Sequence, residues 1–462
     1  MILMKLFNTL SRKRETFTPL KGEVGMYTCG PTVYHYAHLG NLRSFIFEDV
    51  LKRVLLFNKY KVKHVMNITD VGHLSSDADE GEDKMLKGAK REKKTVWEVA
   101  NFYTKAFQDD LKKLNVLPPD IWAKATDHIK EQVALVEKLE EKGFIYIAGG
   151  NVYFDTSKIK NYGKLARLKI DAKTKSRATK DKNKKNPTDF VLWFTKSKFL
   201  DQEMQWDSPW GKGYPGWHIE CSAMASKYLG EQFDIHCGGR DLIPVHHTNE
   251  IAQAEAAFGK KPWVKYWVHN EFLVDNQGKK MAKSAGEFLT LNVLEEKGFA
   301  PLDYRYFCLG TYYGNPLMFS LEALESAKNA RKKLVEKVLG LDNSGKENKK
   351  LQEKYLKQFT ADINDDLNTS KTLATVWGVL KDENLSDKDA KVLLLKFDEV
   401  LGLGLRDLKA EKISTEVKKL AEERLKARNK KNWVQSDKLR DKISELGYVI
   451  EDTKEGYGLK KK

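Results

Sequence analysis

Apolar and polar positions alternate over the first seventy residues in a way that predicts a parallel α/β unit. Residues 24–28 form a short apolar run, Cys29 and the Gly-Pro pair after it end that run, and residues 41–57 carry apolar side chains at helical spacing. A second strand is predicted at 61–69. Strand, glycine-bearing turn, helix and strand in this order are typical of nucleotide-binding folds, whose ligands lie beyond the strand ends.

The hydrophobic pattern of the remaining chain predicts an interrupted α/β domain followed by helices. Residues 85–145 look largely helical, 145–200 irregular with short strands, and strand and helix signals return between 216 and 290. Beyond Pro301 the pattern predicts helices near 320–342, 348–365, 370–382 and 386–402. A separate module follows, with helices near 414–430 and 433–446 and a short terminal hairpin or strand at 448–459. We therefore expect a Rossmann-like parallel-sheet domain in two parts, 1–119 and 216–300, with an insertion at 120–215, a helical region at 301–410 and a small C-terminal domain at 411–462.

The charge and the cysteine content limit the partners and the cellular location that the chain is expected to have. The 462 residues include 81 Lys and Arg against 65 Asp and Glu, a net charge of +16, which favours a polyanionic partner, with nucleic acid ahead of an anionic membrane. No apolar run is long enough for a bilayer and the start lacks a signal peptide, so a cytoplasmic protein without membrane contact is expected. The four cysteines contain no Cys-x-x-Cys pair and are expected to be reduced and free to bind metal.

One segment holds half of the excess charge. Residues 164–185 contain ten Lys or Arg and two Asp, a net charge of +8. A solvated loop is slightly favoured over a segment dedicated to phosphate contacts.

Two clusters suit phosphate chemistry, although neither the dinucleotide fingerprint nor the P-loop sequence is present. His38-Leu39-Gly40-Asn41 lies at the predicted turn into the first helix, where a histidine can donate a hydrogen bond and a glycine lets an anion approach the helix N-terminus. The loop 278–286 is bounded by glycines and carries three lysines, which can neutralise charge on a triphosphate. Each cluster alone is weak evidence.

A third cluster suits a metal ion. His246 and Glu250 are four residues apart, so on a helix they share one face, and Cys221 and Cys29 can supply thiolates. The spacing admits His247 as readily as His246. A zinc site is therefore possible from the residues alone.

Taken in order, these motifs resemble a known family. The order is Cys29-Gly-Pro-Thr-Val-Tyr34, His38-Leu-Gly-Asn41, Asn67-Ile-Thr-Asp70, Gly216-Trp-His-Ile-Glu-Cys-Ser222, His246-His-Thr-Asn-Glu250 and Lys280-Met-Ala-Lys-Ser284. It resembles the cysteinyl-tRNA synthetases, which are class I aminoacyl-tRNA synthetases. The resemblance runs from about residue 20 to the C-terminus and is weakest in 164–185.

The resemblance implies that cysteine and ATP form cysteinyl-adenylate and pyrophosphate, after which cysteine passes to the 3′-terminal ribose of tRNA(Cys). It assigns catalysis to His38, Asn41, Lys280 and Lys283, and ATP binding, with Mg²⁺, to His38, Gly40, Asn41, Gly239, Asp241 and Lys283. The family's second signature histidine is Asn41 here, and an amide can donate a hydrogen bond but cannot be cationic. Ala282 replaces a serine, which is a milder change.

The resemblance also selects the metal ligands. It implies one zinc ion per subunit, held by Cys29, Cys221, His246 and Glu250, with His246 chosen over His247. Zinc binds a soft thiolate better than a serine hydroxyl, so it can separate cysteine from serine where shape cannot. Four protein ligands fill a tetrahedron, and Glu250 is the ligand expected to yield to the substrate. The amino-acid pocket is assigned to Thr69, Trp217 and His236.

The C-terminal module is assigned to the anticodon. Residues 411–462 carry 15 Lys or Arg against 10 acidic residues. Side chains that read unstacked bases there are Arg428, Trp433, Asp437 and Asp452. We expect a monomer that binds tRNA(Cys), ATP and L-cysteine. The alternatives are a ligase that couples cysteine to a small amine, which would lack this module, and a non-catalytic RNA-binding homologue, which the Asn41 departure would favour.

Overall fold

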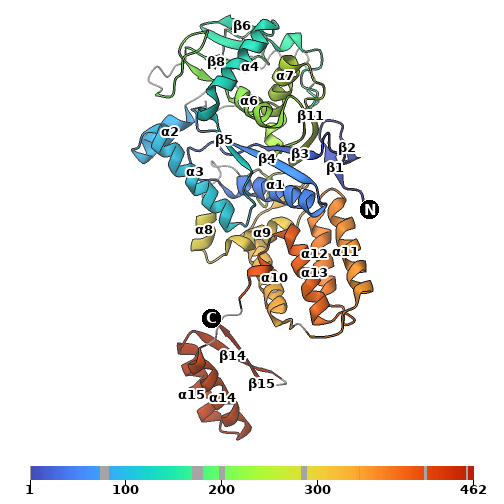
Figure 1. Cartoon of the computed structure of the whole chain (residues 1–462). Coiled ribbons are helices and arrows are strands. Elements are labelled where there is room, and N and C mark those ends of the chain that lie inside the picture. The colour runs from blue at the N-terminus through green and yellow to red at the C-terminus, as the bar shows by residue number, and fades with distance from the viewer. Residues whose placement is uncertain are drawn as a thin grey trace. The chain divides into compact units, whose positions relative to one another are not determined.

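The computed structural model describes residues 2–72, 83–168, 181–196, 203–281, 289–342, 344–409, 414–453 and 456–461. The chain divides into two compact units, Met1–Arg406 and Asp407–Lys462. The first unit contains the central sheet, its insertion and a helical region (Figure 1).

A five-stranded parallel sheet is the centre of the first unit. Its strands are β3 (Glu23–Thr28), β4 (Lys61–Ile68), β5 (Ile121–Lys124), β10 (Phe233–Gly239) and β11 (Val264–Asn270). They lie in the order β11-β10-β3-β4-β5, and every neighbouring pair is parallel. The Rossmann-like parallel sheet predicted from the sequence is confirmed.

Helices cover both faces of this sheet because its strands are apolar on both sides. Val65 and Met66 are adjacent on β4 and belong to different core clusters, one on each face. Helix α1 (Leu39–Phe57) packs on the Met66 face, and α6 (Trp217–Leu229) packs on the other face. Helix α7 (His246–Phe258) packs against α6. The N-termini of all three helices therefore come near the carboxyl ends of the strands.

The prediction of a largely helical 85–145 misses a strand. Helices α2 (Lys84–Glu92), α3 (Val96–Lys113) and α4 (Ile129–Glu141) are present, but β5 lies between α3 and α4 as the edge of the sheet. β5 has only four residues, and its pairing with β4 supplies the stability that its short sequence pattern does not indicate.

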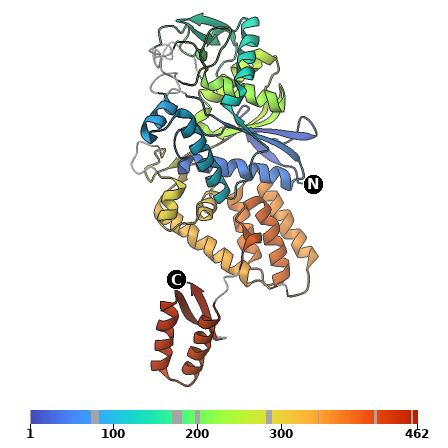
Figure 2. The ribbon, with the colours of Figure 1, turned by 60° about the vertical axis from the view of Figure 1, so that its left-hand side comes forward.

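The insertion is a small antiparallel sheet with α4 beside it. Strands β6 (Ile145–Ala148), β7 (Asn151–Phe154), β8 (Phe190–Phe194) and β9 (Tyr214–Pro215) follow one another in space. Apolar side chains of this sheet share a core cluster with α6 and α7, so the insertion rests on the helices that carry the predicted metal ligands (Figure 2). Most of the lysine-rich 164–185 segment lies outside the described residues.

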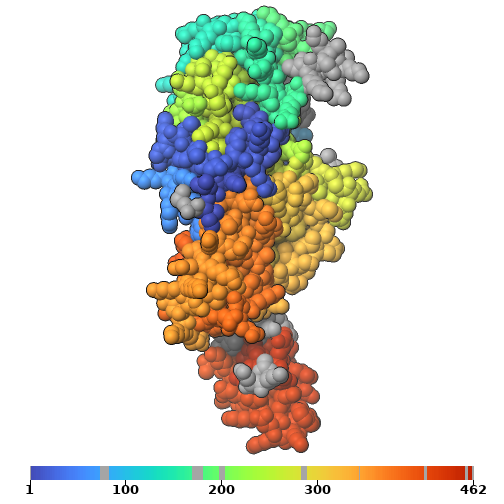
Figure 3. Space-filling model, turned by 90° about the vertical axis from the view of Figure 1, so that its right-hand side faces the viewer, coloured from blue at the N-terminus to red at the C-terminus, as the bar shows by residue number. Residues whose placement is uncertain are grey.

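The helical region lies at the opposite end of the first unit from the insertion (Figures 1 and 2). It consists of α8 (Leu291–Glu296), α9 (Pro301–Leu309), α10 (Leu321–Gly340), α11 (Lys349–Asn364), α12 (Thr369–Val379) and α13 (Asp387–Leu401). These bounds confirm the predicted helices between 320 and 402. The N-terminal hairpin of β1 (Lys5–Asn8) and β2 (Lys13–Thr16) touches this region, since Phe7 N donates to Asp366 Oδ1 at 2.8 Å (Figure 3).

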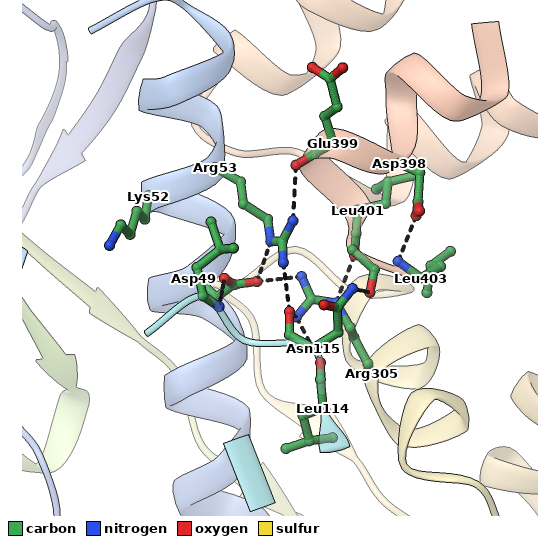
Figure 4. A network of polar contacts seen from close by, with 12 residues as sticks. Asp49, Lys52, Arg53, Leu114, Asn115, Arg305, Asp398, Glu399, Leu401 and Leu403 are labelled. Atoms are coloured by element: carbon green, nitrogen blue, oxygen red, sulfur yellow. Dashed lines mark hydrogen bonds and ion pairs between the residues drawn. The ribbon is translucent and has the colours of Figure 1, made fainter. Parts of the chain in front are cut away.

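A buried ionic network joins this region to α1 (Figure 4). The guanidinium of Arg305 on α9 is fully buried, and its Nη2 lies 2.5 Å from Asp49 Oδ2. Arg305 also donates to the carbonyls of Leu401 and Leu114, at 2.7 and 3.1 Å. Arg53 Nε reaches the same Asp49 oxygen at 2.7 Å. The network holds α1, α9 and α13 in fixed relation, which fixes the helix that begins at His38.

The second unit is a helical hairpin with a two-stranded sheet. Helices α14 (Thr415–Asn429) and α15 (Trp433–Glu445) pack together, and β14 (Tyr448–Thr453) pairs antiparallel with β15 (Gly456–Lys461). Its core is small and includes Val417, Ala421 and Ile443. The predicted helices are confirmed, and of the two forms expected for the terminal segment, hairpin or strand, the structure has the hairpin.

Candidate active site and metal centre

A cleft of about 330 Å³ opens at the carboxyl ends of β3, β4 and β10. It lies where the strand order of a parallel sheet places ligands. Nine of the predicted site residues line it, namely Cys29, His38, Asn41, Thr69, Trp217, Cys221, Gly239, Asp241 and His246. Residues up to 217 positions apart thus form one wall, since Cys29 and His246 both face this cleft.

The first turn of α1 forms the end of the cleft that is predicted to bind phosphate. His38 is the N-cap residue, and its Nδ1 accepts a hydrogen bond from the backbone N of Asn41 at 3.2 Å. A neutral imidazole that accepts at Nδ1 carries its proton on Nε2. A Cβ on Gly40 would lie 2.9 Å from His38 Cε1, so a side chain there would displace the ring. Glycine therefore preserves both the cap and the access of an anion to the helix N-terminus.

The turn after β3 approaches β4 very closely. Gly30 N donates to Asn67 Oδ1 at 2.8 Å, and a Cβ at position 30 would lie 1.7 Å from the Asn67 carbonyl oxygen. Asn67 Nδ2 donates to Thr69 Oγ1 at 3.0 Å, and Thr69 donates to Glu220 Oε2 at 3.0 Å. Glu220 is fully buried. This chain of bonds fixes Cys29, the cleft wall at Thr69 and the residue next to Cys221.

Four side chains of types that can ligate a metal meet at the inner end of the cleft. Ligand atoms of Cys29, His246, His247 and Glu250 all lie within 4.8 Å of one another. His246 Nε2 is 3.0 Å from Glu250 Oε1, and Cys29 Sγ is 3.3 Å from His247 Nε2. Helix α7 supplies the last three because positions 246 and 250 share one helix face and 247 lies beside them. Sequence spacing alone could not choose between the two histidines, and the structure brings both into the cluster.

Cys221 adjoins this cluster from α6. Its thiol hydrogen-bonds with Cys29 and His246. Burial alone would raise the pKa of Cys221, but the hydrogen bond from Cys29 and the neighbouring His246 lower it. Burial, together with Cys221 and Glu250, raises the pKa of the Cys29 thiol well above its usual value. The lowered pKa of Cys221 thus favours the thiolate at that sulfur, and the thiolate is the form that binds metal.

The charges of the cluster are set by mutual contacts. Burial opposes ionisation of Glu250, yet His236 and His246 hold the pKa of this carboxyl at about 2. Burial lowers the pKa of His246, but Glu250 and Cys221 outweigh it and raise that pKa to about 10. Burial and four neighbouring histidines lower the pKa of His247 well below its usual value. The protein thus gathers an anionic carboxylate, a thiol of lowered pKa and a neutral imidazole at one point.

Further side chains contact the residues of this cluster and orient them. His236 Nε2 lies 2.9 Å from Glu250 Oε2, and His236 is fully buried between Glu250 and Trp267, on which it stacks. The structure therefore places this predicted pocket residue behind the candidate metal ligands. Trp217 lines the cleft and stacks on His246 with ring centroids 4.3 Å apart.

The predicted ribose and lysine-loop residues meet on the other side of the cleft. Gly239 is the last residue of β10 and Asp241 follows the strand, and Lys280 Nζ lies 2.8 Å from Asp241 Oδ2. A Cβ on Gly239 would lie 2.5 Å from Asp241 Oδ1. Lys283 and the rest of the loop from 282 to 288 lie outside the described residues.

Glu48 is a cleft residue that sequence reasoning missed. It lies on α1 ten residues after His38, lines the cleft and is 1% exposed. Neither carboxylate oxygen makes a normal hydrogen bond to any described residue, and burial raises its pKa well above the usual value despite the nearby Thr28 hydroxyl. Helical spacing could have found it, because positions 41, 45 and 48 share one face of α1.

The predicted base-reading residues of the second unit are partly accessible. Trp433 is 55% exposed, and the guanidinium of Arg428 lies 5.4 Å from its ring centroid. Asp452 is bound by Arg424 at 2.7 Å and by Arg428 at 3.2 Å, and the Arg424 hydrogen bond lowers its pKa. Asp437 pairs with Arg440 at 3.2 Å on the exposed surface. An exposed indole beside a guanidinium is suited to stacking on a base.

Comparisons with known proteins agree with this geometry. Residues 16–329 match the model of the tRNA synthetases class I (C) catalytic domain, and 410–457 match the cysteinyl-tRNA ligase anticodon binding domain. The chain is 49% identical to a cysteine–tRNA ligase of Treponema denticola, with 97% of this chain and 98% of that protein aligned. It is 46% identical to cysteine–tRNA ligase 1 of Burkholderia lata, with 99% and 96% aligned.

Solved structures show the same fold. Mycobacterium tuberculosis methionyl-tRNA synthetase bound by methionyl-adenylate superposes with a TM-score of 0.55 at 16% identity, covering 82% of this chain and 90% of that one. Sheet, cleft and matched domain together define a class I aminoacyl-tRNA synthetase. Within that class, the chain belongs to the cysteinyl-tRNA synthetase family and is an enzyme with cysteine–tRNA ligase activity. In the part of the chain that the structure describes, no helix combines the length and apolar character needed to cross a membrane.

Proposed function

We propose that the enzyme forms cysteinyl-adenylate from L-cysteine and ATP, releases pyrophosphate, and passes the cysteinyl group to the 3′-terminal ribose of tRNA(Cys). The observation that supports this most is the single cleft shared by the N-cap of α1 and the cysteine, histidine and glutamate cluster. One end of that cleft suits the phosphates of ATP, and the other suits a small substrate that carries a thiol.

The residues at the inner end fit a zinc ion. Thiolate, imidazole and carboxylate are all zinc ligands. Glu250 Oε1 is buried and accepts no hydrogen bond of normal geometry from the described residues, although His246 Nε2 lies 3.0 Å away. Two such atoms converging without a good hydrogen bond suit a shared cation. When bound, zinc would supply a soft acceptor for the thiolate of cysteine and a poor one for the hydroxyl of serine.

We assign the ligands as Cys29, Cys221, His246 and Glu250, and His247 as a hydrogen-bond donor to Cys29. His247 Nδ1 lies 2.7 Å from His269 Nε2, whose Nδ1 lies 2.8 Å from Thr9 Oγ1. If Thr9 donates along this chain, His247 presents an N–H to the Cys29 sulfur, 3.3 Å away. The reverse direction would leave Nε2 of His247 a lone pair for the metal.

The remaining residues bind ATP and orient the reacting groups. The Nε2 of His38 and the side chain of Asn41 donate to the phosphates, and Gly40 leaves room for them. Gly239 and Asp241 hold the ribose, since a carboxylate accepts from its hydroxyls. Lys280 and Lys283 neutralise the charge that develops on the leaving pyrophosphate, with Mg²⁺ accompanying ATP. Thr69 and Trp217 line the amino-acid pocket, and His236 positions Glu250. Glu250 is the ligand that we expect to yield to the substrate.

The second unit serves the anticodon in this proposal. Arg428, Trp433, Asp437 and Asp452 are the side chains we assign to base recognition, and the family match at 410–457 supports that use. The same unit weighs against a ligase that couples cysteine to a small amine.

The domain limits at 119, 215, 300 and 410 stay predictions, as do the monomeric state and the cytoplasmic location.

The test is pyrophosphate exchange with purified protein, comparing cysteine with serine, and zinc measured on the same sample. Strong exchange with cysteine, negligible exchange with serine and about one zinc per chain are expected. Zinc without exchange would mean that Asn41 has removed the activity, and the non-catalytic RNA-binding alternative would replace this proposal. Equal exchange with serine would overturn selection by metal.

A further inference from the structure

A second and larger cavity lies on the other side of α7 from the active site. Its volume is about 670 Å³, and its walls come from α7 and from the segment between β7 and β8. Ile251, Ala252 and Ala256 of α7 contribute an apolar floor, and Phe144 and Tyr162 add aromatic rings. His246 and Glu250 on the same helix face the metal cluster. The cavity therefore shares a wall with the active site but none of its proposed catalytic residues.

The cavity has a strongly cationic rim. Its charged lining residues are five lysines, Lys142, Lys158, Lys160, Lys164 and Lys261, and one acid, Glu255. The glutamate is already neutralised, because Lys164 Nζ lies 2.7 Å from its Oε1 and 2.8 Å from its Oε2. Four positive charges therefore surround the cavity without a lining acid to balance them.

The rim lysines differ in whether their ammonium groups already donate hydrogen bonds. Lys142 Nζ donates to the Ala257 carbonyl at 2.7 Å, and Lys158 donates to the Gly143 carbonyl. A carbonyl takes one ammonium proton and leaves two for another acceptor. Lys160 and Lys261 are exposed, and neither forms a hydrogen bond or ion pair with a residue that the structure describes. These two are the side chains most available to an incoming anion.

We propose that this cavity binds a small organic anion of about nucleotide size, with an aromatic or apolar body on the floor and a phosphate or similar group against Lys160 and Lys261. The volume falls in the range of ligand pockets, about 300 to 1,000 Å³. A buried apolar floor ringed by cations matches a ligand with one charged and one apolar end. An RNA backbone instead needs cations along an open surface, where no apolar floor is used.

The shared helix gives the occupant a direct connection to the active site. Tyr162 in the cavity wall donates from its hydroxyl to Asn249 Oδ1 at 2.5 Å, and Asn249 precedes Glu250 on α7. Thr248, another lining residue, donates to the Ile243 carbonyl at 2.7 Å, in the segment that follows the ribose-binding Asp241. A ligand in this cavity would contact the face of α7 opposite to the face that carries the proposed metal ligands.

The experiment uses the fluorescent anion 1-anilinonaphthalene-8-sulfonate, which joins an aromatic body to a fixed negative charge. Binding is titrated with the full-length protein while saturating ATP fills the catalytic cleft. The test protein carries Lys160→Glu and Lys261→Glu, and the matched control carries Lys112→Glu and Lys130→Glu, two exposed lysines outside the cavity lining. Both variants change the charge equally, so only position differs.

We expect one saturable site whose affinity falls by roughly tenfold or more in the test protein and stays within twofold in the control. Cysteine-dependent pyrophosphate exchange should be unchanged in both, because none of these lysines lies in the proposed catalytic site. Equal anion binding by all three proteins would overturn the proposal. So would displacement of the anion by tRNA together with a shallower salt dependence of tRNA binding in the test protein, since the rim would then be an RNA contact.

Discussion

The ammonium group of Lys280 lies 2.8 Å from Asp241 Oδ2, so the first lysine of the Lys280–Ser284 motif is paired with the carboxylate proposed to hold ribose. Both side chains are about half exposed, 42% and 50%. An exposed ion pair contributes about 0–1 kcal/mol, so ribose can replace Lys280 at Asp241 at little cost. The released lysine is then free to move toward the phosphates.

This relationship predicts how the Lys280→Met variant behaves. The KM for ATP in pyrophosphate exchange should change little, because only a weak ground-state pair is lost. The kcat should fall by roughly 10²-fold, because a cation that acts on developing charge is gone. Lys279→Met, which changes the neighbouring lysine, is the control and should retain nearly full kcat. A raised KM with unchanged kcat would show that Lys280 only binds ATP.

Two substitutions can distinguish the proposed metal ligands from His247. Cys221→Ala should lose zinc and cysteine-dependent exchange together, because a thiolate ligand cannot be replaced by a methyl group. His247→Asn should keep about one zinc per chain and lose activity only in part, since the amide can still donate toward Cys29. Zinc content measured by atomic absorption, with exchange on the same samples, checks both. The opposite pattern, zinc lost in His247→Asn and kept in Cys221→Ala, would assign His247 as the ligand.

The buried network around Arg305 predicts a stability effect without a catalytic one. Arg305→Met leaves the fully buried Asp49 with one cationic partner and removes donors to Leu401 and Leu114. Removing one partner of a buried pair costs about 3–5 kcal/mol. The thermal midpoint of the first unit should fall clearly. Lys138→Met breaks an exposed pair with Glu231 and should change stability by less than about 1 kcal/mol. Similar midpoints for both variants would contradict the network's role.

The sequence predicts the parts of the site that a local pattern marks, and it misses the parts that depend on tertiary packing. Cys29, His38 and Asp241 follow strands or begin a helix, so local pattern and order along the chain predict that they meet. Glu48 was missed because a carboxylate on an amphipathic helix is usually solvated, and only the packing of distant strands buries it. Arg305 was missed for the same reason, since its partner Asp49 is 256 residues away. Helical spacing can place Glu48 on the same face of α1 as Asn41, but no local pattern indicates that a charged side chain is buried.

Buried His64 predicts a pH dependence of stability. Its Nε2 lies 2.9 Å from Thr28 Oγ1, and burial, assisted by the charge of Lys52, lowers its pKa to about 3. An unfolded chain takes up this proton near pH 6.5, whereas the folded chain does not until about pH 3. The stabilisation that comes from keeping His64 neutral in the folded protein is therefore fully present above pH 6.5. As the pH falls from 6.5 toward 3, the free energy of unfolding decreases by about 1.4 kcal/mol per pH unit.

The His64→Leu variant isolates that contribution. Urea unfolding of both proteins at pH 7.5, 6.0 and 5.0 should show the free energy of unfolding falling less steeply with acid in the variant. The free energy of unfolding of the parent minus that of the variant should therefore decrease as the pH falls, whatever the variant's stability at pH 7.5. Parallel pH profiles would show that His64 takes up its proton at the same pH in the folded and the unfolded protein.

Trp433 provides a test of the second unit that leaves the chemistry of the first intact. Its indole is 55% exposed beside the guanidinium of Arg428, and stacking of a base on an aromatic ring contributes about 1–3 kcal/mol. Trp433→Ala should therefore weaken binding of tRNA(Cys) by roughly tenfold or more. Pyrophosphate exchange, which needs no tRNA, should be unchanged. Val434→Ala alters the adjacent side chain, which is 70% exposed, and should leave tRNA affinity within twofold. If both variants bind tRNA like the parent, Trp433 does not contact a base, and recognition must rest on other side chains of the unit.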